Sequence, residues 1–361
     1  MRNLTVGRVR KTDQKVIPSV LFARLHQHGF GMVSKMRFVL LAVLTFAGCI
    51  PPQDGLTDPD RLRPFHQGDT DGGALIPDLG AVNPEPIEPE RQVSVATFNV
   101  KRFFDTQCQS GQCGEGAFEG VYSQSEFEAR ARRIANGVME LDADILLLQE
   151  FETEACLDEL VALLGTERYP VAIIAETGGT ATLDVAVLAN ASLIKTVKHR
   201  QDRIPQPGGG TTTFSRELLE VHLDVRGHPV IAFNAHYKSK NNDDARRRLA
   251  EAMASREIVL AAAEAHPGSL VLLGGDLNDT PGSSPLDALE AGGDLIRVAS
   301  ELEDSTTHVF NGRAIALDHL YWAETDGGGY LPGSAEVVRN GERGHAGSDH
   351  AALRAVFYFR Q

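Results

Sequence analysis

The stretch that decides the fold of this chain covers residues 270–283 and reads LVLLGGDLNDTPGS. It opens with an apolar run bounded by glycines, which is typical of a buried strand in an open α/β sheet. Asp276 and Asn278 follow, and alternate residues of a strand point to the same side. A carboxylate and a carboxamide are therefore expected to converge at the carboxyl end of this strand. The alternative interpretation of these two residues alone is an ordinary Asx-type turn.

Length and composition are those of a globular protein. The chain has 361 residues, of which 42% are hydrophobic and 23% are charged, which suits one large domain or two small ones. Its net charge is −14, and residues 36–361 carry −20 because residues 1–35 hold seven Lys or Arg and one acid. Such a surface repels polyanions, so a nucleic acid or phosphate ester could bind only through a local basic patch or a divalent metal.

Residues 36–49, MRFVLLAVLTFAGC, predict an export signal. They combine one Arg, an apolar core and small residues before Cys49, and they are too few to span a bilayer as a helix. The segment resembles a bacterial lipoprotein signal with Cys49 as the lipid-bearing residue, although Phe46 stands where Leu is more common. An ordinary secretory signal or a buried apolar segment is the alternative.

The regions around this signal predict the domain organisation. We expect residues 1–35 to be a mis-called start and residues 50–91, which are rich in Pro, Gly and Asp, to be a disordered linker. The folded domain is expected over residues 92–361. The protein would then be a cell-envelope lipoprotein at the outer membrane or periplasmic face, or a secreted protein.

Export would place the other cysteines in an oxidising compartment. Cys108 and Cys113 lie in the sequence CQSGQC and could close a small ring, so a disulfide between these two is predicted. Pairing of either one with Cys156 is the alternative. The sequence contains no CxxC motif and no His/Cys zinc spacing.

Polar side chains also stand at the ends of other predicted strands. They are Asn99 after VSVATF, Glu150 after ADILLLQ, His236 after HPVIAFNA, Asp318 after AIAL, and Asp349 with His350 in GSDH. Taken singly, Asn99 is explained as a turn residue and Glu150 as half of a structural salt bridge. Asp318 and Asp349 are each followed directly by a His in the sequence. An Asp that bonds a His raises the basicity of the imidazole, so both Asp-His pairs are candidates for proton transfer or oxyanion stabilisation.

A local basic patch is predicted just beyond His236. A long helix over residues 243–265 follows it, with arginines in its first turns. The alternative for these arginines is a solvated helix face. The expected members of the patch are Lys238, Lys240, Arg246, Arg247 and Arg248.

The order of these motifs resembles that of the endonuclease/exonuclease/phosphatase superfamily, which includes deoxyribonuclease I. The resemblance covers roughly residues 93–358 and rests on GGDLND and GSDH in combination, with QE upstream. HYKSK and TFNVKRFFD look most like the bacterial extracellular nuclease branch. One departure is Lys101, which stands where abasic-site endonucleases often carry an acid, and this counts against a second metal site of that kind.

The resemblance implies a four-layer α/β/β/α sandwich, in which two mixed sheets lie face to face with helices outside. It also implies metal-dependent hydrolysis of phosphodiester bonds, by an exported nuclease acting on DNA or RNA. A phosphoesterase acting on sphingolipid or inositol-type phosphates, or a non-catalytic surface binding lipoprotein, is the alternative. The protein is expected to be a monomer. Its expected partners are its substrate and a membrane, which it would contact through the lipid on Cys49.

Site roles follow from the resemblance and from the residue types. Oxygen donors favour a hard cation, so Mg²⁺ is expected, with Mn²⁺ and Ca²⁺ as alternatives. Glu150 would hold it, with Asn99 and Asp349 contributing directly or through water. Among the catalytic residues, Asp276 would deprotonate the attacking water, Asn278 would position it, His236 and His350 would bond the phosphoryl oxygens, and Asp318 would hold His350.

Overall fold

The computed structural model describes residues 87–179, 182–341 and 344–360. The predictions for residues 1–86, which include the export signal, the lipid on Cys49 and most of the linker, lie outside the described residues. Among the helices that the structure describes, none has both the length and the hydropathy that a transmembrane span requires.

The first sheet has seven strands in the order β15-β17-β1-β2-β4-β3, with β16 paired to β17. Its centre is parallel, because β1 and β2 run in the same direction, and its other pairs are antiparallel. The strands are β1 (Gln92–Phe103), β2 (Ile145–Phe151), β3 (Val171–Ile174), β4 (Asp184–Ala189), β15 (Gly328–Tyr330), β16 (Glu336–Val338) and β17 (Ala352–Phe359).

The second sheet has six strands in the order β11-β14-β10-β9-β8-β5, and two short hairpins, β6–β7 and β12–β13, stand beside the sheets. Only β9 and β10 pair in parallel within this sheet. The strands are β5 (Ser192–Lys198), β6 (Ile204–Pro205), β7 (Thr211–Thr212), β8 (Leu219–Val225), β9 (His228–His236), β10 (Leu270–Asp276), β11 (Leu295–Arg297), β12 (His308–Phe310), β13 (Arg313–Ile315) and β14 (Asp318–Ala323).

The helices begin at polar caps. Ser123 and Glu126 form a capping box at α1, and Asp244 accepts a hydrogen bond from a first-turn amide of α3. Ser283 also precedes a helix, α4, but its side chain makes no cap hydrogen bond. The helices are α1 (Gln124–Leu141), α2 (Glu154–Leu164), α3 (Ala245–Ala265) and α4 (Ser284–Glu290), with 3-10 turns η1 (Pro89–Arg91), η2 (Ala291–Gly293) and η3 (Val298–Glu301).

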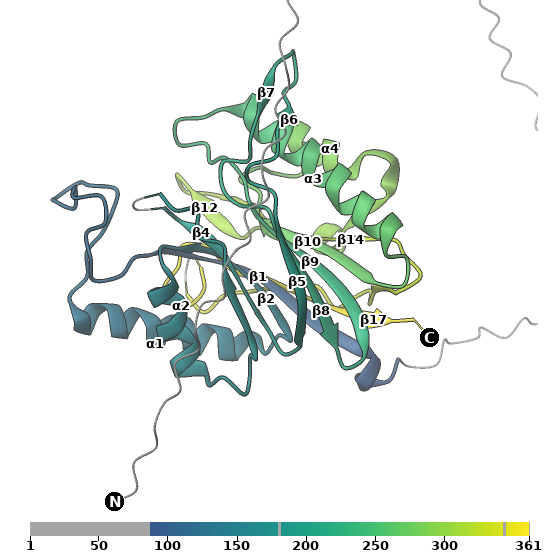
Figure 1. Ribbon diagram of the computed structural model, residues 1–361, viewed down its shortest axis with the longest axis horizontal. Helices are drawn as coiled ribbons and strands as arrows, with labels where there is room; N and C mark the ends of the chain where they lie inside the picture. The colour runs from purple at the N-terminus through teal and green to yellow at the C-terminus, as the bar shows by residue number, and fades with distance from the viewer. Residues whose placement is uncertain (1–86, 180–181, 342–343, 361) are drawn as a thin grey trace, which may run out of the picture. The chain divides into compact units, whose positions relative to one another are not determined.

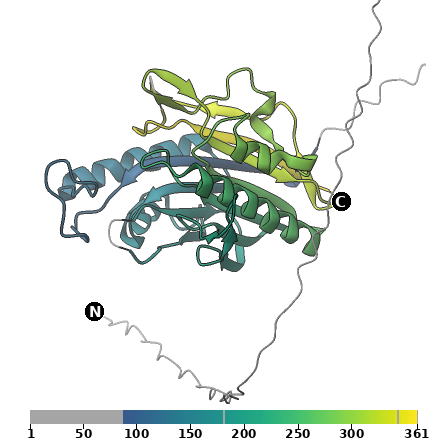
Figure 2. The same cartoon turned by 90° about the horizontal axis from the view of Figure 1, so that it is seen from above.

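Three apolar layers hold these elements together. One lies between the two sheets, one between the first sheet and helices α1 and α2, and one between the second sheet and helices α3 and α4. Figure 1 shows the helix pairs on opposite sides of the strands, and Figure 2 shows α3 lying across the second sheet. The four-layer α/β/β/α sandwich that the sequence predicted is confirmed.

Alternate residues of the central strands belong to different layers. In β10, Leu270 and Leu272 face the other sheet, whereas Val271 and Leu273 face α3 and α4. A strand that is buried on both faces needs apolar residues at every position, which is why its sequence is a continuous apolar run rather than an alternating one.

The two glycines before Asp276 are required by close packing. A side chain at Gly274 would meet Leu320 and Leu147, at 2.5 and 2.7 Å. Gly275 has φ +148°, and a Cβ there would lie 1.8 Å from the carbonyl oxygen of Ala235 on β9. The motif GGD therefore lets β10 run close to both neighbours and delivers Asp276 at the sheet edge.

Candidate active site

Three adjacent strands of the second sheet end in a row of ionisable side chains. In the register of the sheet, Asp276 on β10 lies opposite His236 on β9 and opposite Asp318 on β14. Residues directly opposite one another in a sheet point to the same face. The hydrogen-bond register alone thus brings two carboxylates and one imidazole together.

Glu150 comes from the first sheet and is placed by a bulge. The pairing of β2 with both of its neighbours shifts between Gln149 and Phe151, and Glu150 itself has φ 70°. This left-handed conformation is unfavourable for a residue with a side chain. Its Oε2 accepts a hydrogen bond of 2.7 Å from the backbone amide of Arg102, another residue with positive φ. The bulge points the Glu150 carboxylate toward the second sheet.

Asn99 joins the two sheets. Its Nδ2 donates to Asp276 Oδ2 at 2.9 Å and to Glu150 Oε1 at 3.3 Å, while its Oδ1 accepts from the amide of Lys101 at 2.9 Å. Asn99 is fully buried. One amide side chain therefore fixes the relative positions of the two acids that come from opposite sheets.

Asp276 is held and tuned by its surroundings. Its Oδ1 accepts a 2.9 Å hydrogen bond from the amide of Asn278, whose own side chain donates to the Tyr237 carbonyl at 3.2 Å. Burial raises the pKa of Asp276 to about 7. The nearby charge of His350 lowers this pKa and that of Asp318 raises it, so these two effects oppose each other. Asp276 is thus a carboxylate whose basicity suits proton abstraction near neutral pH.

The two imidazoles at this site carry different charges. His350 Nδ1 lies 2.8 Å from Asp318 Oδ2, and although burial opposes it, the Asp318 carboxylate raises the pKa of His350 to about 10. His236 is buried without such a partner, and burial holds its pKa well below the ordinary value. Its Nε2 lies 3.6 Å from Asp276 Oδ2 and 3.9 Å from Glu150 Oε1. The surroundings therefore favour the charged form of His350 and the neutral form of His236.

These side chains border a cavity of about 430 Å³. Of the eight residues predicted to be catalytic or to hold a metal, the cavity lining includes five. The lining residues are Glu150, His236, Ser239, Lys240, Asn241, Asp276, Asn278, His308, Phe310, Ile315, Leu317 and His350. Asn99 and Asp318 lie directly behind it, because each bonds a lining residue.

Asp349, the third predicted metal ligand, faces a cation of the chain itself. Its Oδ2 lies 2.9 Å from Lys101 Nζ, and this contact holds its pKa low despite burial. Asp349 does not line the cavity, although one of its carboxylate oxygens lies within 4.8 Å of ligand atoms of His308 and His350.

The donor set fits a hard divalent cation. Glu150 presents a carboxylate to the cavity, Asn99 adds an amide beside it, and a second group of close ligand atoms is formed by Asp276, Asp318 and His350. Carboxylate and amide oxygens are the ligands of Mg²⁺, Mn²⁺ and Ca²⁺. The chain also lacks nearby Lys or Arg partners for Glu150 among its described ion pairs, so a cation would supply charge that the protein does not.

The five predicted substrate-binding cations are arranged differently from one another. Lys240 lines the cavity, with its Nζ 2.9 Å from Asp279 Oδ1. Arg248 is buried between Asp243 and Asp279, at 2.7 and 2.8 Å. The remaining three donate to backbone carbonyls of the chain: Lys238 to Asn241, Arg246 to Pro207, and Arg247 to Thr213.

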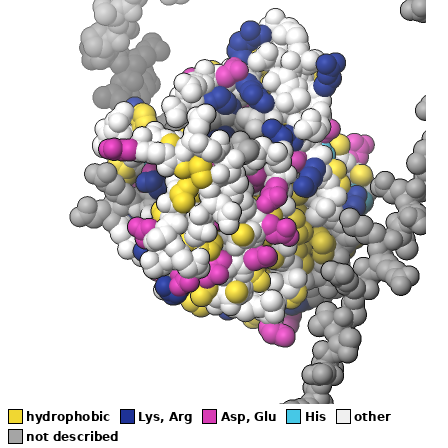
Figure 3. All heavy atoms as spheres, turned by 60° about the vertical axis from the view of Figure 1, so that its left-hand side comes forward, with side chains coloured by type: hydrophobic (Ala, Val, Ile, Leu, Met, Phe, Trp, Pro, Cys, Tyr) yellow, Lys and Arg dark blue, Asp and Glu magenta, His cyan; other side chains and the backbone are white. Residues whose placement is uncertain are grey.

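The surface charge is nevertheless uneven. On the face drawn in Figure 3, Lys and Arg side chains gather at the height of the β6–β7 hairpin, and acidic side chains lie mainly below them. Arg246 belongs to this end of the molecule, because it bonds the carbonyls of Pro207 and Gly209 between β6 and β7.

Sequence reasoning missed the residues that form the far wall of the cavity. His308 and Phe310 on β12, Ile315 on β13, and Leu317 just before β14 all line it. The sequence does carry a signal for this hairpin, since Asn311-Gly312 between two short β-prone runs is a favoured two-residue turn. Nothing in these runs, however, indicates that they face a site.

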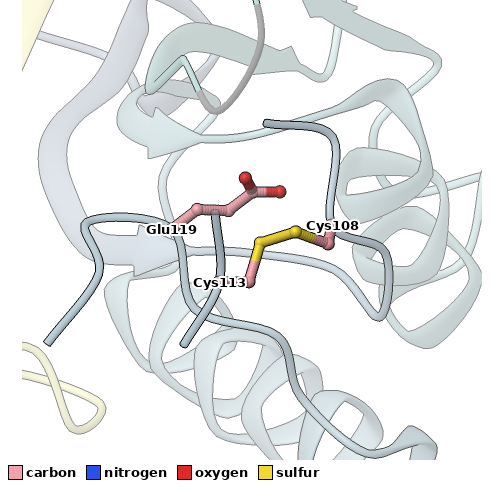
Figure 4. A group of neighbouring side chains, drawn as sticks. All are labelled: Cys108, Cys113 and Glu119. Atoms are coloured by element: carbon pink, nitrogen blue, oxygen red, sulfur yellow. A yellow bond between two sulfur atoms is a disulfide. The ribbon is translucent and has the colours of Figure 1, made fainter. Parts of the chain in front are cut away.

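A disulfide joins Cys108 and Cys113 in the loop after β1, and Cys156 is a buried free thiol on α2. Figure 4 shows the Glu119 carboxylate beside this disulfide. Glu119 accepts hydrogen bonds from the amides of Gln109 and Ser110, at 2.5 and 2.8 Å, inside the ring. The disulfide and Glu119 together fix the shape of the loop.

Comparisons with known proteins agree with this architecture. The sequence model of the Endonuclease/Exonuclease/phosphatase family matches residues 96–350. A comparison with curated protein sequences finds no match. Among solved structures, TDP2 of Caenorhabditis elegans is similar at 19% identity, with a TM-score of 0.53 over 77% of this chain and 78% of that one.

Two further structures are similar to about the same degree. The catalytic domain of human Nocturnin, solved with a bound sulfate anion, has 16% identity and a TM-score of 0.54, over 74% of this chain and 94% of that one. An endonuclease/exonuclease/phosphatase family protein of Bacteroides thetaiotaomicron has 15% identity and a TM-score of 0.54, over 75% and 98%. At these identities the likeness shows the shared fold.

Proposed function

Because the chain belongs to the Endonuclease/Exonuclease/phosphatase family, whose members are hydrolases acting on phosphoester bonds, we propose that it is a divalent-metal-dependent phosphodiesterase. More narrowly, we propose an exported, membrane-anchored nuclease that acts on DNA or RNA as a monomer. The observation that carries the proposal is the convergence of Asn99, Glu150, His236, Asp276 and His350 from two sheets at the cavity.

The proposed reaction is attack by water on the phosphorus atom, with the chain supplying the base and the charge. The bond from phosphorus to one ester oxygen breaks, and that oxygen leaves as an alcohol after taking a proton from solvent. Asp276 takes the proton of the attacking water, and its Oδ1 bond to the Asn278 amide keeps the carboxylate aimed. His350, charged and held by Asp318, donates from Nε2 to a phosphoryl oxygen as negative charge develops there. His236 binds the phosphoryl group as a neutral imidazole. No covalent enzyme intermediate is required.

When bound, a divalent cation neutralises a non-bridging phosphate oxygen and so stabilises the transition state. Glu150 would hold it, with Asn99 and Asp349 contributing directly or through water. Mg²⁺ is the proposed ion, and Mn²⁺ and Ca²⁺ are the alternatives.

A nucleic acid is favoured over other phosphodiesters by the cations near the cavity. Lys240 lines it, and in the first turn of α3 Arg246 is exposed and Arg247 half-buried. The charge of −20 on residues 36–361 acts in the opposite direction, and it would suit a sphingolipid or inositol-type phosphate as well. These phosphoesters are therefore the second candidate substrates.

Plasmid nicking tests the proposal. Wild-type protein is expected to nick supercoiled plasmid with Mg²⁺ and not with EDTA. Glu150→Gln keeps the size of the side chain and removes its charge, so turnover should fall by orders of magnitude. Glu264→Gln, an exposed acid on α3, is the matched control and should cut normally.

Full activity in EDTA, or in Glu150→Gln at saturating Mg²⁺, would contradict the metal assignment. Plasmid, RNA, sphingomyelin vesicles and inositol phosphates, assayed side by side, then rank the substrates. An absence of hydrolysis on all four, with Mg²⁺, Mn²⁺ and Ca²⁺ each tried, would favour the non-catalytic binding protein instead.

A further inference from the structure

The β12–β13 hairpin places an aromatic ring at the mouth of the cavity. Phe310 is the last residue of β12, and Asn311 and Gly312 make the turn with φ 50° and 79°. The Phe310 side chain lines the cavity and yet is 60% exposed. An exposed aromatic ring gains the free energy of apolar burial only when another group covers it.

The hairpin is fastened to the proposed catalytic residues. The Thr307 hydroxyl accepts hydrogen bonds from the amides of Leu317 and Asp318, both at 3.1 Å, and its carbonyl accepts from the amide of Ala351 at 2.7 Å. Next to it, the rings of His308 and His350 lie 4.5 Å apart. Phe310 is therefore held at a fixed place relative to the Asp318–His350 pair rather than on a free loop.

The cavity consequently has two unlike ends. His236, Asp276 and His350 are the polar lining where a phosphoryl group would bind, and Phe310 with Ile315 and Leu317 is the apolar lining contributed by the hairpin and the residue before β14. A ligand that fills both ends carries a phosphodiester attached to a flat apolar group. A nucleotide has this composition, and stacking on an exposed aromatic ring is how unpaired bases are commonly bound.

We propose that this hairpin binds an unpaired base next to the scissile phosphate, with Phe310 as the stacking surface, and that the preferred substrate is single-stranded nucleic acid. The inference rests on the proposed phosphodiesterase function. A base inside a duplex is stacked on its neighbours, so its faces reach Phe310 only after unpairing, which costs a few kcal/mol.

The hairpin suits a base better than a lipid surface. Phe310 is the one large apolar side chain that is mostly exposed on the described residues of this hairpin, and Asn311, Gly312 and Arg313 surround it with polar groups. A membrane-inserting element needs a broader apolar surface. Lys240 also lines the cavity, and its ammonium group, which contacts Asp279 Oδ1 at 2.9 Å, could contact a neighbouring phosphate of a strand.

The test compares kcat/KM on a single-stranded oligonucleotide, on the same sequence as a duplex, and on a strand of equal length made of abasic residues. Wild-type protein should prefer the single strand. Phe310→Ala should lower kcat/KM on it by about 5- to 100-fold, and Phe310→Trp should restore the rate. The abasic strand should respond little to either change.

Ile194→Ala removes an equally exposed apolar side chain from the edge strand β5 and serves as the control, with no expected effect. Since Phe310 is exposed, its removal should leave the thermal midpoint unchanged. Binding of a labelled single strand in EDTA, followed by fluorescence anisotropy, gives a readout that needs no catalysis, and Phe310→Ala should weaken it.

Equal losses on the single strand and on the abasic strand would overturn the proposal, because Phe310 would then only support His350. Unchanged kcat/KM and anisotropy in Phe310→Ala would overturn it as well. A loss confined to sphingomyelin vesicles would assign the ring to a lipid surface. A wild-type protein that binds the single strand through Phe310 but cuts nothing would refute the proposed function and leave the base site standing.

Discussion

The Oδ2 atom of Asp276 is the most contacted atom of the site. It lies 2.9 Å from Asn99 Nδ2, 3.6 Å from His236 Nε2 and 4.0 Å from His350 Nε2. Only the first of these distances is a hydrogen bond, so a lone pair of Oδ2 stays available between the two imidazoles. A water that used this lone pair would lie between a neutral and a charged ring, where both its proton and its oxygen have a partner.

The pairing of Asp318 with His350 can be tested by rates. His350→Ala should lower turnover by about 10²- to 10⁴-fold, and Asp318→Asn should lower it less, with near-normal substrate binding in both. Because the two side chains act as one unit, the double variant should be little worse than His350→Ala alone. Asp326→Asn, an exposed acid, is the control. The measurement is initial rate at one saturating Mg²⁺ concentration, and losses that simply multiply would show that the two residues are independent.

At the scale of the elements, strands and helices could be predicted from the sequence, but residues with an unusual backbone conformation could not. The apolar run gave β10, and the predicted helix over residues 243–265 matches α3 to within two residues. The sequence did not reveal that Glu150 sits in a bulge with positive φ, because that conformation is imposed by pairing with two neighbouring strands. Local propensity carries no information about such tertiary constraints.

The expected basic patch shows the same limit. Three consecutive arginines at the start of a helix cannot be told apart by sequence. The helix period, however, points each side chain toward different neighbours. Arg248 points inward to two carboxylates, and Arg246 points outward to a loop carbonyl. Arg247 is half-buried, and its Nε lies between the Thr213 carbonyl and the buried Glu251 carboxylate. Arg248 has a structural role because α3 packs next to Asp279. This contact joins residues that are far apart in the sequence, so the sequence around the arginines does not indicate it.

These arginines are therefore expected to respond differently to substitution. Arg248→Gln leaves the buried Asp279 with only Lys240, and it should lower the free energy of unfolding by about 2–4 kcal/mol. Arg246→Gln, a change at an exposed side chain, should cost less than about 1 kcal/mol, but should raise KM on long nucleic acid and flatten its salt dependence. Urea unfolding and KM at several salt concentrations measure the two effects. Equal destabilisation in both variants would argue against this division.

At the scale of the whole molecule, acid stability should depend on a carboxylate far from the cavity. Glu220 on β8 lies between His199 and His222, contacting Nε2 of each ring. Burial opposes its ionisation, but the two imidazoles lower its pKa from 4.5 to about 2. A carboxyl group with a depressed pKa stabilises the folded state above its unfolded pKa, and this stabilisation is lost as pH falls through the folded value.

Glu220→Gln should thus reduce the free energy of unfolding by roughly 1–3 kcal/mol at pH 6. The difference from wild type should shrink as the pH is lowered from 4.5 toward 2. Glu257→Gln, an exposed acid on α3, should have little effect at either pH. Urea unfolding at pH 6 and pH 3 checks the prediction, and a difference that is the same at both pH values would contradict it.

The first and last strands of the domain are neighbours. The first half of β1 pairs with β17, from Gln92 opposite Tyr358 to Thr97 opposite Leu353. During synthesis, β1 emerges first and keeps one edge open until β17 has been made, so the first sheet cannot close on a nascent chain. Asn99 lies within β1, two residues beyond the last residue paired with β17, and His350 comes just before β17. A ribosome-bound chain that stops short of β17 therefore has no assembled site, and the candidate active site forms only in the finished domain.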